Sequence, residues 1–176
     1  CFQYLSQRLR DNRELALSAV KNRGIYLEYA SPRLRDDKEF VKIALKNGST
    51  LTSVSERLKN DIEIVVACVS EDNSTLRDFP EVFKDDERVI EACLKERRNS
   101  NPFNRKMYIQ GSAYQYFSNR FKEDRKIALK LSQGTGFNLS VCPEIFKNDK
   151  QIVKNAVKES ANNFEHIGSE LIKEGI

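Results

Sequence analysis

The sequence has no tryptophan, one methionine and one histidine among its 176 residues. Its few cysteines lack C-x-x-C spacing and stand at Cys1, Cys68, Cys93 and Cys142. We therefore expect no structural zinc site and no metal or other cofactor. Three of the cysteines occupy positions where neighbouring repeats carry small apolar residues, which indicates buried thiols in a reducing, cytoplasmic compartment.

Long hydrophobic runs and charge of one sign are also missing. No apolar run approaches the roughly 18 to 20 residues that span a bilayer, and the first residues do not read as a secretory leader, so no membrane partner is expected. Thirty Lys and Arg face 26 Asp and Glu, a net charge of +4. These interspersed charges are not the one-sided surface of a strong nucleic-acid binder.

What the sequence does contain is a recurring phrase, "RLRDD" and its variants. The apolar residue at its centre falls at Leu9, Leu34, Leu58, Phe83, Phe121, Phe146 and Leu171. Their spacings are 25, 24, 25, 38, 25 and 25 residues. Periods of roughly 20 to 50 residues mark solenoid-type arrays.

After each anchor, apolar residues at i, i+1, i+4 and i+5 predict one stripe of a helix of about 10 to 12 residues. Leu15 and Ala16 begin this stripe in the first repeat. Capping-box spacing predicts the start of the helix at the following pairs: Asp11 with Glu14, Asp36 with Glu39, Asn60 with Glu63, and Asn148 with Gln151. Glycine or asparagine ends it.

A second, shorter helix is predicted between the end of one long helix and the next anchor. Apolar residues at i and i+3, such as Leu27 with Ala30 and Phe164 with Ile167, would bury one of its edges. Such helix pairs must stack to form a core. We predict an all-α fold, an α-solenoid of six to seven short-helix/long-helix repeats forming one domain over residues 1–176, within a longer protein.

The phrases "YASPRLRDDKEFVKIALKNG" and "VSERLKNDIEIVVACV" resemble a family of tandem helical repeats known only as a domain of unknown function. The units of that family read roughly L-x-Y-A-S-x-x-L-R-D-D-K-E-V-V-x-x-A-V. The likeness is clear over repeats one to four and looser in repeats five and six. The resemblance implies stacked helices and supplies no activity or catalytic residue.

The period breaks once, where 13 extra residues fall within residues 95–111. Insertions in repeat arrays emerge as loops on one face and often carry function. Cationic and aromatic residues here would suit an acidic peptide, a phosphate or a nucleic-acid backbone: Arg97, Arg98, Phe103, Arg105, Lys106 and Tyr108. The alternative is a solvated loop or an extended helix end without a partner.

One position of the repeat is basic in successive units. The residues at such an equivalent position form a column, and this basic column is a second candidate surface. The residues of this basic ladder are Arg10, Arg35, Lys59, Lys84, Lys122 and Lys147. Residues of one column line up along a repeat array, which predicts a positive stripe. The next column is acidic, however, so neutralisation through surface ion pairs is the favoured interpretation.

No pattern predicts catalysis. The glycines of "SQGTGF", residues 132–137, lack the strand, helix and Lys-Ser/Thr pair of a phosphate-binding loop. His166 has no cysteine or serine partner in the repeat geometry. A variable column of the short helix, including Tyr4 and Tyr29, could read RNA bases as helical repeats do, but ordinary surface variability explains it better.

The sequence therefore predicts a non-enzymatic binding or scaffolding module for a protein or peptide, with weak end-to-end self-association. One alternative is a nucleic-acid-binding repeat that uses the basic insertion and ladder, in keeping with a pI near 8.8. A steep loss of affinity with salt would distinguish it. A further alternative is the regulatory arm of an enzyme whose catalytic domain lies outside this chain.

Overall fold

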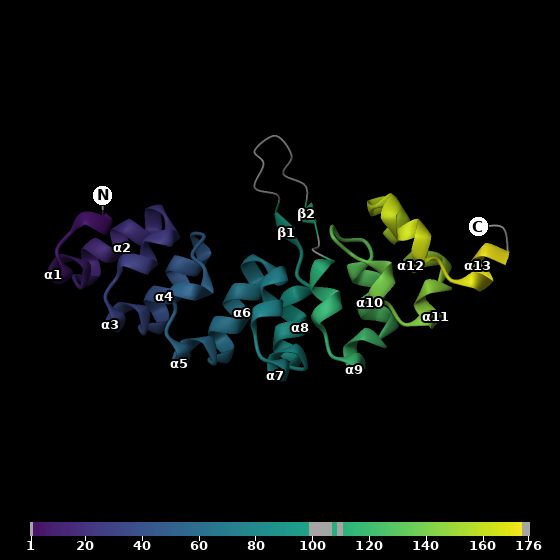
Figure 1. The fold of residues 1–176 in the computed structure, drawn as a ribbon, viewed down its shortest axis with the longest axis horizontal. Coiled ribbons are helices and arrows are strands. Elements are labelled where there is room, and N and C mark those ends of the chain that lie inside the picture. The colour runs from purple at the N-terminus through teal and green to yellow at the C-terminus, as the bar shows by residue number, and fades with distance from the viewer. Residues whose placement is uncertain (1, 99–106, 109–110, 174–176) are drawn as a thin grey trace. The chain divides into compact units, whose positions relative to one another are not determined.

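The computed structural model describes residues 2–98, 107–108 and 111–173. The chain forms two compact units, Cys1–Asp72 and Asn73–Ile176 (Figure 1). Within the described residues, no helix is long and apolar enough to cross a membrane.

The first unit repeats three elements three times, where η denotes a 3-10 helix. They are η1 (Phe2–Tyr4), α1 (Gln7–Arg10), α2 (Arg13–Asn22), η2 (Gly24–Tyr29), α3 (Pro32–Arg35), α4 (Lys38–Lys46), η3 (Leu51–Ser53), α5 (Glu56–Lys59) and α6 (Ile62–Glu71). The predicted short helix is thus a 3-10 segment. The predicted turn before the long helix is itself one turn of α-helix, which makes the repeat a three-element unit.

The second unit follows the same order and adds two short strands. Its elements are η4 (Asn73–Asp78), α7 (Glu81–Lys84), α8 (Glu87–Cys93), β1 (Arg97–Arg98), β2 (Met107–Tyr108), η5 (Ser112–Tyr116), α9 (Asn119–Lys122), α10 (Arg125–Leu131), η6 (Leu139–Val141), α11 (Glu144–Lys147), α12 (Lys150–Glu159), η7 (Ala161–His166) and α13 (Ser169–Lys173). The predicted helical class is confirmed for the repeats. The antiparallel pair β1–β2 within the insertion departs from the all-α expectation.

The long helices begin one residue later than the capping-box spacing predicted. The side chain of Asp37 accepts the backbone N–H of Phe40 at 2.9 Å and caps α4, whereas Asp36 ends α3. Residues of the same column cap the other long helices: Asn12, Asp61, Asp86, Asp124 and Asp149. The long helices have 7 to 10 residues: α2, α6 and α12 have the predicted length of about 10, and α4, α8 and α10 are shorter.

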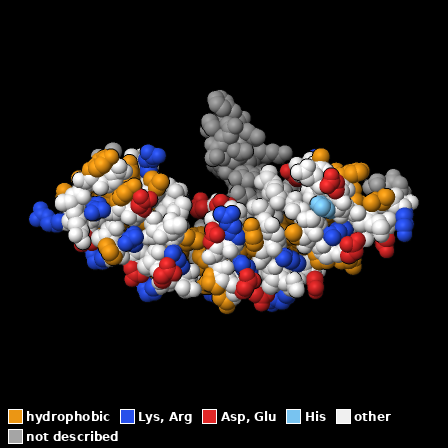
Figure 2. Space-filling view, viewed as in Figure 1, with side chains coloured by type: hydrophobic (Ala, Val, Ile, Leu, Met, Phe, Trp, Pro, Cys, Tyr) orange, Lys and Arg blue, Asp and Glu red, His pale blue; other side chains and the backbone are white. Residues whose placement is uncertain are grey.

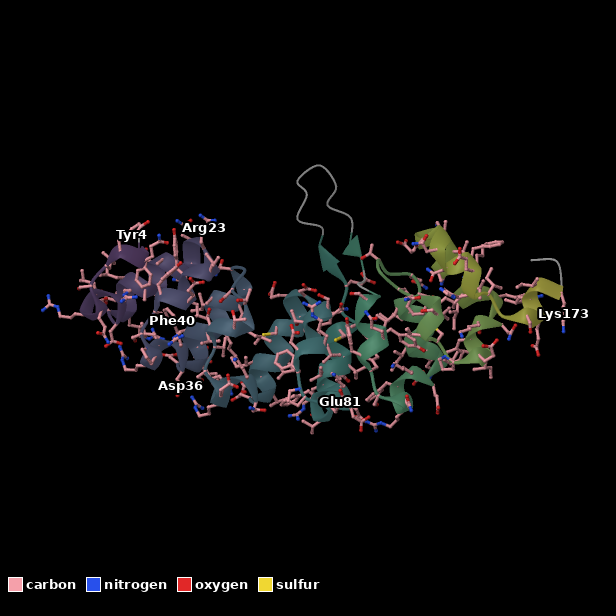
Figure 3. The ribbon with its side chains drawn as sticks, viewed as in Figure 1. Tyr4, Arg23, Asp36, Phe40, Glu81 and Lys173 are labelled. Atoms are coloured by element: carbon pink, nitrogen blue, oxygen red, sulfur yellow. The ribbon has the colours of Figure 1, made fainter. Side chains whose placement is uncertain are left out.

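The apolar stripe forms the core of each unit. Helices α2 and α4, and α4 and α6, pack against each other in the first unit, and α10 packs against α12 in the second. Phe40 is fully buried in this core (Figure 3). Two predicted core residues are exposed instead, Leu15 by 44% and Phe164 by 62%.

Candidate partner-binding site

Asp11 joins the first repeat to the second. Its carboxylate accepts a hydrogen bond from the hydroxyl of Ser31, the residue before α3. Arg33, within α3, approaches Asp11 twice: its Nε lies 3.1 Å from Oδ1, and its Nη2 donates to the Asp11 carbonyl at 2.9 Å. One guanidinium therefore donates to two acceptors, which its rigid, planar fork of donors suits better than an ammonium group.

We call this set of an acidic residue, a serine and an arginine the arginine clamp. It recurs twice: Asp36 with Ser55 and Arg57, and Asp85 with Ser118 and Arg120. The arginine Nη2 atoms there lie 2.9 and 3.0 Å from the aspartate carbonyl oxygens. In the first unit, Asp36 lies at the edge opposite to Tyr4 and Arg23 (Figure 3). At these three junctions, the acidic residue after the ladder position thus bonds the next repeat and does not cap its own long helix.

The two clamps of the first unit lower the pKa of their aspartate carboxyls. At Asp11 the hydrogen bond from Ser31, followed by that from Arg33, holds the carboxyl pKa below its ordinary value of 3.8. The hydrogen bonds from Ser55 and Arg57 lower the pKa of Asp36 in the same way. Both donors favour the charged form, so the clamps are complete only while these carboxylates are ionised.

Sequence reasoning missed the clamp, although a signal for it is present. Its members change together along the chain. Val82 and Ile145 take the arginine position, and in both cases proline replaces the serine. The preceding repeats then carry Asn60 and Glu123 in place of aspartate. Such joint replacement at a separation of about 20 residues is what a contact between repeats would produce.

The basic ladder lies at partly buried positions at the ends of the one-turn helices. The Lys84 side chain, for example, is only 13% exposed. Three lysines pair with a glutamate three residues earlier: Lys59 with Glu56, Lys84 with Glu81, and Lys147 with Glu144. These glutamates thus neutralise three of the six ladder residues, whereas the acidic column that was expected to do so serves the clamps at three junctions.

Two ladder residues differ from the lysines in their surroundings. The Nε atoms of Arg10 and Arg35 are buried and have no hydrogen-bond partner within the described residues. Basic and acidic side chains are interspersed over the face shown in Figure 2. That the ladder binds a partner stays a prediction.

The basic insertion begins and ends in the pair β1–β2. Arg97 stands opposite Tyr108, and Arg98 opposite Met107, in antiparallel register. Three other predicted binding residues lie outside the described residues: Phe103, Arg105 and Lys106. The strand pair holds residues 97–98 and 107–108 of the insertion side by side, and we call this part its base.

A buried asparagine joins the two ends of the insertion. Asn73 has no exposed surface. Its Nδ2 donates to the carbonyl of Cys93, the last residue of α8, at 3.3 Å. Its Oδ1 accepts from Ser112, the first residue of η5, at 3.2 Å. Sequence reasoning saw Asn73 only as a helix-ending residue.

Gly111 fixes the end of the insertion more tightly. Its N–H donates to the carbonyl of Thr135 at 2.7 Å. A Cβ atom here would lie 2.6 Å from Cβ of Phe137 and 2.7 Å from the carbonyl oxygen of Leu131, so only glycine allows this approach. Both ends of the insertion are therefore held by buried contacts of the second unit.

The thiols of the described residues are buried and have little reactivity. Burial raises the pKa of the Cys68 and Cys142 thiols to about 12, far from the thiolate form that nucleophilic catalysis needs. Across residues 2–98, 107–108 and 111–173, no three His, Cys, Asp or Glu side chains gather as metal ligands. That the base of the insertion binds a partner stays a prediction.

Comparison with protein families gives a match. The family model described as Domain of unknown function (DUF4116) matches four overlapping or separate segments: residues 1–35, 12–51, 37–84 and 124–172. The multiple segments agree with a repeated domain, and residues 85–123, which include the insertion, are not matched. No curated protein and no solved structure matches the chain. Because the matches cover more than half of its length, the chain belongs to the DUF4116 family of unknown function.

Proposed function

We propose that this chain is a helical-repeat module that binds a protein partner and performs no catalysis of its own. The finer arrangement in this proposal is an α-solenoid, in which each repeat stacks on the one before it. Packing of α2 on α4 and of α4 on α6, together with the recurring arginine clamp, supports such stacking. A stacked array displays one long surface, which suits scaffolding.

The observation that carries the proposal is the fixed base of the insertion. Asn73 and Gly111 hold its two ends against buried groups, while Arg97 and Arg98 begin it in a paired strand. A basic segment on a rigid base loses less conformational entropy on binding than a free loop does. An acidic protein surface is the complementary partner.

Nucleic acid is the less favoured ligand because three ladder lysines are already paired with glutamates. The regulatory arm of an enzyme remains the alternative for the longer protein. We also propose a cytoplasmic location, supported by the burial of Cys68 and Cys142.

The test is a quantitative pulldown with the intact parent protein, comparing Arg97→Ala/Arg98→Ala with the unmodified chain. We expect the loss of two positive charges to reduce capture of a specific protein while the melting temperature stays unchanged. The matched control is Lys154→Ala/Lys158→Ala, two exposed lysines of α12 in the same unit.

The same pulldown is repeated after nuclease treatment and over a range of salt concentration. A protein captured equally by the Arg97→Ala/Arg98→Ala chain would rule out the insertion as the binding surface. Capture that disappears with nuclease, with a log–log salt slope near −0.9 for each duplex phosphate contacted, would assign the surface to nucleic acid instead.

A further inference from the structure

One junction of the second unit lacks the arginine clamp and is hollow. Between α9 and α11, the acceptor position is Glu123, the serine position is Pro143, and the arginine position is Ile145. A depression with a volume of ≈ 260 Å³ lies here, lined by Asn119, Lys122, Glu123, Val141, Cys142 and Pro143. At the three clamps, the serine and arginine side chains bridge the equivalent junction.

Hydrogen bonding of the backbone at this junction also differs from that at the clamps. At the clamp of Asp85, the N–H of Ser118 donates to the Lys84 carbonyl at 3.1 Å. Pro143 has no N–H, so the equivalent carbonyl of Lys122 accepts instead from the hydroxyl of Tyr114, at 2.6 Å. The backbone hydrogen bond that joins the start of α9 to the preceding repeat therefore has no counterpart at the start of α11. A hydrogen bond from Tyr114, in η5, takes its place.

The acceptor side of the clamp nevertheless remains. In the part of the chain that the structure describes, no hydrogen bond or ion pair reaches the Glu123 carboxylate. Ile145, at the arginine position of the clamp, is 73% exposed. An unpaired carboxylate thus borders a hollow whose other walls include Val141 and Pro143.

We propose that this hollow receives an arginine side chain of a partner protein, which completes the missing clamp from outside. The guanidinium donates to the Glu123 carboxylate and adjacent carbonyl, as Arg120 donates to Asp85, and the aliphatic stem packs on Val141 and Pro143. The negative charge of Glu123, at the position that Asp85 holds in its clamp, favours a guanidinium.

Lys122 also borders the hollow and is of the same charge as the proposed ligand. The clamps show that such a neighbour is compatible with arginine. Arg10 and Arg35 directly precede Asp11 and Asp36, and neither prevents its clamp from forming. At the Glu123 junction the cation has the same place in the repeat, so the electrostatic setting is comparable.

The probe is a synthetic acetylated and amidated peptide with the sequence FSNRFK, which is that of residues 117–122 of this chain. Titration into the isotope-labelled full chain, followed by two-dimensional NMR, should shift the amide signals of Lys122, Glu123 and Val141 in a saturable way. Peptides with Gln or Lys in place of Arg should bind about fivefold more weakly, as expected for one exposed charge pair.

Two variants of the chain make the assignment specific. Glu123→Gln should weaken binding of the FSNRFK peptide about fivefold. Ile145→Arg should abolish it, because the new arginine occupies the hollow from within the chain. The matched control is Glu159→Gln, an exposed glutamate of α12, which should bind the peptide as the unmodified chain does.

Equal affinity of the Glu123→Gln and unmodified chains would overturn the proposal, as would peptide-induced shifts confined to other residues. Shifts of the same signals by inorganic phosphate would assign the hollow to an anion and also overturn it. So would a concentration-dependent dimer that Glu123→Gln abolishes, because the occupant would then be a second copy. The site is separate from the insertion, so its failure leaves the pulldown with Arg97→Ala/Arg98→Ala unaffected.

Discussion

Replacing Asn73 with leucine tests whether the insertion stands on a fixed base. Leucine has a similar size, so the change removes hydrogen bonds without opening a large cavity. The Cys93 carbonyl loses a hydrogen-bond partner at a buried position, and the partly exposed Ser112 hydroxyl loses another. A buried polar group left unsatisfied costs about 1–3 kcal/mol and a lost hydrogen bond about 1 kcal/mol, so we expect the free energy of unfolding to fall by about 2–4 kcal/mol.

Urea unfolding followed by circular dichroism measures this loss. With a denaturant slope of about 2 kcal/mol/M, the midpoint should fall by about 1–2 M. Hydrogen exchange gives the local readout: the amides of Leu94 and Gly111, on either side of the insertion, should lose more protection than the amides of α12. The control is Asn162→Leu, because Asn162 is exposed in the corresponding 3-10 segment of the last repeat.

A midpoint that is the same for Asn73→Leu and Asn162→Leu would refute the reasoning. So would a fall in the midpoint without a selective loss of protection at Leu94 and Gly111. In that second case Asn73 would contribute to the core of the unit but would not hold the insertion.

Three further predictions concern the repeats. Gly24→Ala should lower the free energy of unfolding by more than about 3 kcal/mol, because the new Cβ would lie 2.2 Å from a backbone oxygen of α4. Gly48→Ala should lower it by only about 1 kcal/mol, because position 48 lies in open space and the cost comes from its φ of +86°. Tyr114→Phe should cost about 1 kcal/mol through loss of its hydrogen bond to the last carbonyl of α9, measured by thermal unfolding. Because the pKa values of Asp11 and Asp36 are lowered in the folded chain, their contribution to stability is present above pH 3.8 and is lost as the pH falls through the folded-state pKa values.

Each of these predictions has its own control. Similar losses for Gly24→Ala and Gly48→Ala would contradict the steric argument. Tyr116→Phe, two residues after Tyr114, removes a partly exposed hydroxyl and should leave the melting temperature unchanged. For the acid dependence, unfolding at several pH values should give a shallower slope when Asp11 and Asp36 are both asparagine; an unchanged slope would exclude the clamps as its source.

The period of the repeat could be predicted from the sequence because helix stripes and caps are local. Apolar residues one, four and five positions apart share a helix face in any context, and they located the long helices. The four-residue helices such as α3 were missed because one turn is too short to show a period. The insertion was located because the spacing from Phe83 to Phe121 differs from all the others.

Capping spacing alone could not say which residue of an Asp-Asp pair caps the helix. Asp36 and Asp37 have the same side chain and stand next to each other. Asp37 faces the free N–H groups of α4, whereas Asp36 faces Ser55 and Arg57 of the next repeat. The choice depends on a group about 20 residues away, which no local pattern contains.

The sequence by itself determined the helical repeat, its length, the apolar stripe and the place of the insertion, since these depend on intervals within one helix or between equivalent residues. Only the tertiary structure decided which charged residues bond between repeats, which lysines are already paired, how Asn73 joins the ends of the insertion and where the hollow beside Glu123 lies. Those features depend on distances between residues far apart in the chain, and such distances exist only after the repeats have packed.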